Sequence, residues 1–217
     1  SFDPNILSGR DYSKNYRNLQ LDTLKPIYNR ALTATYPPGS MFKLIQALIG
    51  LEENVVSKED QIYVDLSRIG DLAPAGIYDL NKAIVNSSNN YFHMLFRKLI
   101  NQKRDNNTFI DSRIGLDRWS EYVKKFGLGS DLDFDISNIS SGFVPSSEYY
   151  DGFYGKGRWK FSNIYSLSIG QGELLVTPIQ MANFASIIAN RGYYYNPNIV
   201  THINGKKISN NQRKYID

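Results

Sequence analysis

Residues 36–43 read YPPGSMFK, and this stretch marks the start of the helix around which the rest of the chain is arranged. Its two prolines and its glycine disfavour helix before Ser40, because proline fixes φ and restricts the residue that precedes it. From Phe42 onward apolar residues recur at helical spacing, which predicts a mostly buried helix running to about Glu53. Ser40 then lies at or near the first turn, and Lys43 lies three residues later on the same face.

Ser40 and Lys43 at this spacing suit an activated hydroxyl group. The N-terminus of a helix favours negative charge, and a lysine amine can take the serine proton if burial lowers its pKa. The tetrapeptide S-x-x-K is also common by chance, so a serine N-cap beside an ordinary solvated lysine is the competing interpretation. The Y-P-P-G that precedes Ser40 favours the nucleophile and base.

The composition fits one globular domain and excludes several classes of site. The chain has 217 residues, of which 41% are hydrophobic and 21% charged, enough for a sizeable core. Its net charge of +4 is spread along the chain. A nucleic-acid partner would need a stripe of clustered basic residues, which the sequence lacks. It has no cysteine, which excludes disulfides and thiolate metal sites, and we expect no metal and no cofactor. No apolar run reaches the ~18 residues that span a bilayer.

A second polar stretch, NSSNN at residues 86–90, separates two apolar runs. A helix is predicted to begin near Tyr78, and a strong apolar pattern resumes at Tyr91. Serine and asparagine favour caps and turns, so a short turn between two helices explains the stretch. The alternative is a polar tip directed into a cleft.

The next two segments are predicted from their polarity and spacing. Residues 101–112 are polar and predict an exposed loop, and an apolar helical face then ends at Phe126 with Gly127 as the C′ residue. Residues 132–157 are rich in Ser, Asp, Gly and Tyr and predict a long surface excursion, of the kind that forms lids and cleft walls.

The last motif is SIGQGE at residues 168–173, followed by a clear helix start. Its two glycines suit backbone turns or the close approach of a ligand, although G-x-G alone is a weak signal for a phosphate cradle. Thr177 as N-cap, with proline at N1 and glutamine at N3, predicts a helix from residue 178. His93 lies on an apolar helix, and a satisfied core or boundary histidine is the preferred interpretation.

Four segments together resemble the transpeptidase domain of class B penicillin-binding proteins, most closely the elongation-type penicillin-binding protein 2 subfamily. They are SFDPN (1–5), NRALTATYPPGSMFK (29–43), AIVNSSNNYF (83–92) and SIGQGELLVTPIQMANFASIIANRG (168–192). The resemblance runs in the family's order from residue 1 to about residue 203. It implies an α+β fold of the serine transpeptidase and β-lactamase type. Residues 1–217 would form an incomplete domain of this kind, mainly its helical part, with the central sheet largely missing.

The resemblance implies a role for each matched residue. Ser40 would be the acylated nucleophile and Lys43 its general base, although the identity of the acylation base is disputed for related class A β-lactamases. Ser87 and Asn89 match the second family motif, S-x-N, so Ser87 would relay a proton to the leaving group and Asn89 would hold the substrate amide. Substrate binding is also expected at Gly170, Gln171 and Gly172.

The reaction implied is cross-linking of peptidoglycan. The serine would attack the D-Ala-D-Ala bond of a stem peptide, release the terminal D-Ala and pass the acyl group to an amine on a neighbouring stem peptide. β-Lactam antibiotics would trap the serine as a stable ester. The partners implied are membrane proteins of the elongation machinery, such as a glycosyltransferase. The location implied is the periplasmic face of the bacterial inner membrane, with an N-terminal anchor outside this chain.

The chain departs from the family in two places. The third motif, K-[ST]-G, is absent, since Lys156-Gly157 is followed by Arg158; we expect the motif beyond Asp217 and the first strands before residue 1. The isolated chain should therefore show at most weak activity. The interval 66–77 also looks short for a family that often has a loop with Cys and His there.

Two other functions fit the same motifs. A serine D,D-carboxypeptidase or β-lactamase would pass the acyl group to water, and a β-lactamase usually needs a carboxylate to position that water, for which we find no candidate. A non-catalytic penicillin sensor or scaffold would keep the pocket without the reaction. The combination of IGQG with T-P-x-Q favours the transpeptidase over both.

Overall fold

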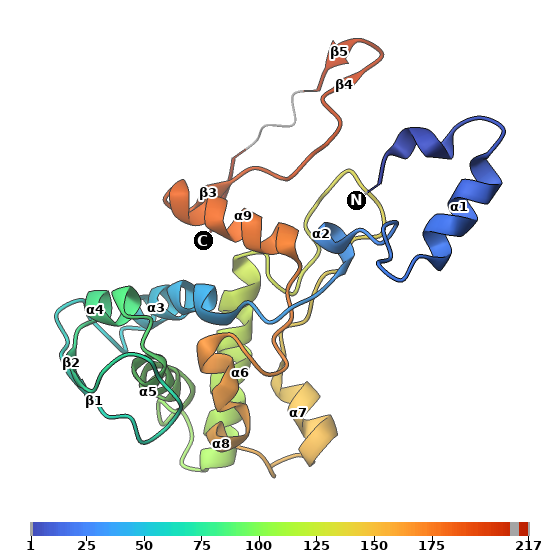
Figure 1. Cartoon of the computed structure of the whole chain (residues 1–217). Coiled ribbons are helices and arrows are strands. Elements are labelled where there is room, and N and C mark those ends of the chain that lie inside the picture. The colour runs from blue at the N-terminus through green and yellow to red at the C-terminus, as the bar shows by residue number, and fades with distance from the viewer. Residues whose placement is uncertain (1, 209–212, 217) are drawn as a thin grey trace.

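The computed structural model describes residues 2–208 and 213–216, and in this part of the chain helices form most of the regular structure (Figure 1). The elements in chain order are η1 (Pro4–Leu7), α1 (Tyr12–Leu21), α2 (Arg30–Thr33), η2 (Gly39–Phe42), α3 (Lys43–Glu52), β1 (Ile62–Val64), β2 (Gly76–Tyr78), α4 (Leu80–Val85), α5 (Asn89–Ile100), α6 (Thr108–Lys125), α7 (Ser147–Tyr154), α8 (Phe161–Ile164), η3 (Tyr165–Ile169), α9 (Pro178–Ala189), β3 (Tyr193–Tyr194), β4 (His202–Ile203), β5 (Lys206–Lys207) and β6 (Lys214–Tyr215).

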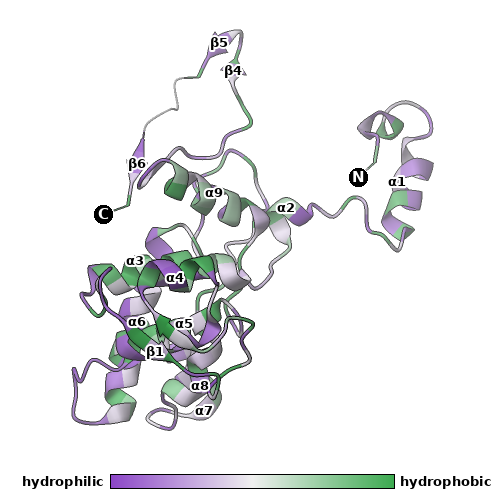
Figure 2. Ribbon diagram, turned by 60° about the vertical axis from the view of Figure 1, so that its left-hand side comes forward, coloured by the Kyte–Doolittle hydropathy of each residue, from purple (hydrophilic) through white to green (hydrophobic). Residues whose placement is uncertain are grey.

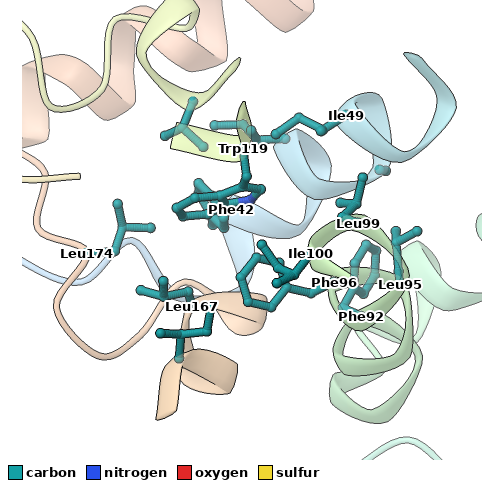
Figure 3. Close-up of a cluster of buried hydrophobic side chains, with 14 of the residues drawn as sticks. Phe42, Ile49, Phe92, Leu95, Phe96, Leu99, Ile100, Trp119, Leu167 and Leu174 are labelled. Carbon is teal, nitrogen blue, oxygen red and sulfur yellow. The ribbon is translucent and has the colours of Figure 1, made fainter. Parts of the chain in front are cut away.

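Helices α3, α5 and α6 pack together around the main hydrophobic core. Figure 3 shows Phe42 of η2 and Ile49 of α3 facing Trp119 of α6 and the apolar side of α5. The indole of Trp119 meets the rings of Phe42 and Phe96 edge to face, with centroids 5.6 and 5.4 Å apart. Because α3 carries Lys43 at its first position, this core fixes the base of the candidate site.

The strands are short and do not merge into one sheet. Among the described residues they form three two-stranded antiparallel pairs, β1 with β2, β3 with β6 and β4 with β5. The α+β class, with the helical part dominant and little sheet, is therefore confirmed.

Most helix boundaries follow the sequence pattern closely. Helix α3 ends at Glu52, one residue before the predicted end, and residues 39–42 before it form a 3₁₀ turn. The helix expected near Tyr78 is α4, and it begins at Leu80 because Asp79 caps it by accepting a hydrogen bond from the Lys82 N–H. The predicted capping box of α9 is present, with Thr177 as N-cap.

Two predicted loops are wrong in part. The loop expected over 101–112 ends at Asn107, whose side chain caps α6. Asp111 in the first turn of α6 is buried, and its carboxylate accepts backbone hydrogen bonds from Lys103 and Arg104. The excursion expected over 132–157 contains helix α7, and its Tyr150 is buried and donates a hydrogen bond to Glu173. The start of α6 is therefore set by its own N-cap, whereas α7 has a partner that is distant in the sequence.

Two segments project from the helical body. In Figures 1 and 2, α1 stands to one side and the β4–β5 hairpin extends away from α9. Neither η1 nor α1 contains a buried residue, so this part adds nothing to the core. No helix within the described residues is both long enough and apolar enough to cross a membrane.

Candidate active site

The turn that carries Ser40 is hydrogen-bonded to the SIGQGE segment. Gly39 has φ +59° and donates its N–H to the Gly170 carbonyl at 2.9 Å. Gly170 has φ +69°, and a Cβ on it would lie 2.3 Å from the Gly39 oxygen, so only glycine allows this approach. Gly170 is buried, whereas Gln171 and Gly172 are exposed. This contact brings the three residues that we expect at the substrate beside the Ser40 turn.

The NSSNN stretch is both a helix–helix turn and part of the site. It joins α4 to α5, with Ser87 in the left-handed region at φ +50° and Ser88 as the N-cap of α5, its Oγ accepting a hydrogen bond from the Tyr91 N–H. The two interpretations of the sequence therefore do not exclude each other. The turn directs Ser87 and Asn89 toward the start of α3.

Lys43 is the centre of the site. Its Nζ donates hydrogen bonds to the Ser87 carbonyl at 2.5 Å, to Ser87 Oγ at 3.0 Å and to Asn89 Oδ1 at 2.6 Å. The ring of Phe92 lies 5.8 Å from the same nitrogen. Lys43 is only 3% exposed, which is rare for a lysine that has no carboxylate in direct contact.

Burial of Lys43 lowers its pKa to about 8, and the nearby Asp71 carboxylate partly opposes this shift. An amine with such a pKa is partly neutral near physiological pH, unlike an ordinary lysine. The competing interpretation of S-x-x-K, a solvated lysine, is therefore wrong. Burial gives Lys43 the lowered pKa that a general base needs, and its role as the base stays a prediction.

Ser40 lies at the surface, one turn before Lys43. Its Oγ makes no hydrogen bond to any residue that the structure describes, so the hydroxyl is open to a substrate. The arrangement consists of an accessible hydroxyl, a buried amine of lowered pKa and a second hydroxyl, that of Ser87, on the same amine. This set suits acyl transfer through a serine ester.

A third segment meets the site, and sequence reasoning missed it. Residues 67–76, whose glycines and proline predict only a loop, place Asp71 against the NSSNN turn, where its Oδ2 accepts hydrogen bonds from Ser88 Oγ at 3.0 Å and the Asn90 N–H at 2.8 Å. Asn89 Nδ2 also donates to the Gly70 carbonyl at 2.7 Å. The only signal in the sequence was an aspartate in a loop, which many surface turns share.

His93 is buried on α5 as expected, but the prediction that it is satisfied is wrong. Its Nδ1 has no hydrogen-bond partner, and its ring packs edge-on against Phe161. A cavity of about 630 Å³ beside this residue is lined by Arg68 and Arg97 and does not reach Lys43. Among the described residues, no three or more His, Cys, Asp or Glu side chains are grouped to hold a metal ion.

Comparisons with known proteins find relatives over almost the whole chain. The family model described as the penicillin binding protein transpeptidase domain matches residues 3–216. The chain is 28% identical over 221 residues to the peptidoglycan D,D-transpeptidase MrdA of Acinetobacter baumannii, covering 95% of this chain and 30% of that protein. The chain thus spans about a third of the length of the curated relatives it matches.

Solved structures give the same result for the fold. PBP2 of Pseudomonas aeruginosa, in complex with WCK 5153, superposes with a TM-score of 0.76 at 29% identity, covering 98% of this chain and 47% of that one. A complex between PBP2 and MreC from Helicobacter pylori gives a TM-score of 0.73 at 23% identity, covering 93% of this chain and 35% of that one.

Proposed function

The chain belongs to the penicillin-binding protein transpeptidase family, and from this premise we propose that it carries part of the active site of a peptidoglycan D,D-transpeptidase. The observation that carries the proposal is the buried Lys43 amine, which has a lowered pKa and is held by Ser87 and Asn89 one turn from an accessible serine. The named relative that supports the reaction is MrdA, to which this chain is similar.

The first half of the reaction forms a serine ester. Neutral Lys43 takes the proton of Ser40 as Oγ attacks the carbonyl carbon of the D-Ala-D-Ala bond, and the Ser40 N–H at the start of the helical turn is one donor to the developing oxyanion. When the C–N bond breaks, the proton passes through Ser87 Oγ to the leaving amine, and D-Ala departs. Asn89 holds the substrate amide throughout.

The second half returns the enzyme to its starting state. The amine of a neighbouring stem peptide attacks the ester and loses its proton to the same Lys43–Ser87 pair, and Ser40 Oγ leaves with a proton. A new amide bond replaces the one that was broken, so no further reactant is needed. A β-lactam ring opens on Ser40 in the same way but leaves an ester that nothing displaces.

The setting of this function follows from the same premise. We propose that the protein acts at the outer face of the bacterial inner membrane, on stem peptides, and together with membrane proteins of cell-wall elongation, such as a glycosyltransferase. The MreC complex of the Helicobacter pylori protein supports assembly with partners of this machinery. Residues 1–217 are proposed to be one part of the transpeptidase domain, its helical side.

Labelled penicillin tests the proposal on the full-length protein. We expect a lasting covalent label that disappears in Ser40→Ala and is kept in Ser162→Ala, which removes another exposed serine. Loss of label within minutes in the wild type would indicate a hydrolase instead. Stable label without cross-linking of stem peptides would indicate a sensor, and label that survives Ser40→Ala would contradict the assignment of the nucleophile.

A further inference from the structure

The loop between β1 and β2 is joined to the candidate site by an unusual density of hydrogen bonds. Besides its bonds to Ser88 and Asn90, the Asp71 carboxylate accepts the Ala73 N–H at 3.1 Å, which closes its own loop. Asn90, which is fully buried, donates from Nδ2 to the Ile69 carbonyl and accepts the Ile69 N–H, at 2.8 and 3.1 Å. The loop is thus attached to the start of α5 at Asp71 and at Ile69, two residues before it.

Ser88 and Asn90, which bind the loop, are next in the chain to Ser87 and Asn89, which accept hydrogen bonds from Lys43. Ser88 and Asn90 alternate along the chain with Ser87 and Asn89, and Asn89 is itself shared, since its Oδ1 accepts from Lys43 and its Nδ2 donates to Gly70. The left-handed backbone of Ser87 is a strained conformation for a residue other than glycine, and it persists only where neighbouring contacts enforce it. The C-terminus of α4 holds Ser87 there through two backbone hydrogen bonds, from the Ser87 N–H to the Ile84 carbonyl and from the Ser88 N–H to the Ala83 carbonyl, and Asp71 holds the other side of the turn through Ser88 and Asn90.

We propose that Asp71 is a positioning residue for this site, whose carboxylate fixes the α4–α5 turn so that Ser87 and Asn89 meet the Lys43 amine. This inference rests on the proposed function, since the positioned groups are those assigned to acyl transfer. Asp71 touches no reacting atom and acts only through the turn and through its charge.

The charge gives Asp71 a second effect that a purely structural residue would not have. Lys43 is faced by Ser87 and Asn89 from the turn, by the Phe92 ring from α5 and by Asp71 from the loop, and of these only Asp71 is ionisable. Burial of Asp71 opposes its ionisation, but the hydrogen bonds that it accepts outweigh this and lower its pKa below the usual value. The carboxylate is therefore charged at neutral pH and raises the pKa of Lys43.

Asp71→Asn removes the charge and one of the two acceptor oxygens, so each effect needs its own measurement. Without the charge, the pKa of Lys43 should fall by about one unit, because a nearby opposite charge shifts a pKa by this order. The midpoint of the pH dependence of acylation should move to lower pH by the same amount. The rate on the high-pH plateau should fall about tenfold or more, because the single oxygen of asparagine cannot accept the hydrogen bonds of both the Ala73 N–H and the α4–α5 turn.

Asp111→Asn is the matched control. Asp111 also joins a loop to a helix by accepting two backbone N–H groups, from Lys103 and Arg104, but it is not among the groups that shift the Lys43 pKa. This variant should lower the melting temperature and leave both the midpoint and the plateau of acylation unchanged. Asp71→Glu, which keeps the charge, should retain the wild-type midpoint with a lowered plateau, and it serves if Asp71→Asn folds poorly.

Two measurements on the full-length protein test the inference. The first is the rate of penicillin acylation from pH 6 to 10. The second is the titration of Lys43, followed by ¹³C NMR of labelled lysine side chains, with Lys43→Arg to assign the signal. A lower Lys43 pKa in Asp71→Asn alone supports the inference, even if acylation is absent and the proposed function fails. Equal behaviour of Asp71→Asn and Asp111→Asn in titration and plateau rate overturns the inference, even if the wild type is acylated normally.

Discussion

At the scale of single residues, Lys43 shows how a charged side chain is kept in a core position. Three oxygens from one turn accept its three ammonium protons, which compensates part of the cost of burial. The remaining cost appears as a pKa of about 8. A general base works best when its pKa lies near the working pH. The cost of burying the Lys43 charge therefore brings the pKa of its amine into the range that proton transfer needs.

The pH dependence of acylation should follow the titration of Lys43. Only the neutral amine accepts a proton, and with a pKa of about 8 the neutral fraction is about a tenth at pH 7 and about nine tenths at pH 9. Acylation by penicillin should therefore rise about tenfold per pH unit below pH 8 and level off above it. A rate that is flat from pH 6 to 9 in stopped-flow measurements would show that Lys43 is not the base.

At the scale of elements, the close packing of α5 and α6 allows only glycine at position 115. Gly115 of α6 lies against the end of α5, where a Cβ would come 2.0 Å from the Ile100 carbonyl oxygen. Backbone atoms cannot move aside as a flexible side chain can. The two helices therefore approach each other only because residue 115 has no side chain.

Gly115→Ala should destabilise the protein by about 2–4 kcal/mol, because the added methyl group separates the helices that hold the core. The control is Gly152→Ala in α7, where nothing lies within 4 Å of the added Cβ. That variant should be stabilised by about 0.5–1 kcal/mol through the better helix propensity of alanine. Denaturant unfolding of both measures the difference, and similar stabilities for the two variants would disprove the packing argument.

At the scale of the whole molecule, the parts contribute unequally. The helical body around Trp119 holds the buried residues, while the segment with η1 and α1 stands apart and buries none (Figure 2). We therefore expect the body to fold without that segment. The site belongs to the body, since its residues come from the start of α3 and from the α4–α5 turn.

Deletion of residues 1–21 should leave the melting temperature of the chain within about 2 °C of the wild-type value, because little apolar surface is lost from the core. Circular dichroism at 222 nm measures the transition. A matched deletion cannot be made within the body, so Gly115→Ala serves as the destabilised reference. A drop as large as in that variant would mean that α1 packs on the body in solution.

The sequence by itself determined the features that depend on neighbours along the chain. The start of a helical segment beside Ser40, the position of Lys43 three residues later and the capping box at Thr177 follow from proline, glycine and helical periodicity, which act over a few residues. Tertiary structure alone decided the burial of Lys43, its hydrogen bonds to residues 44 and 46 positions away and the part played by Asp71. These depend on which distant segments pack together, and no local pattern encodes that choice.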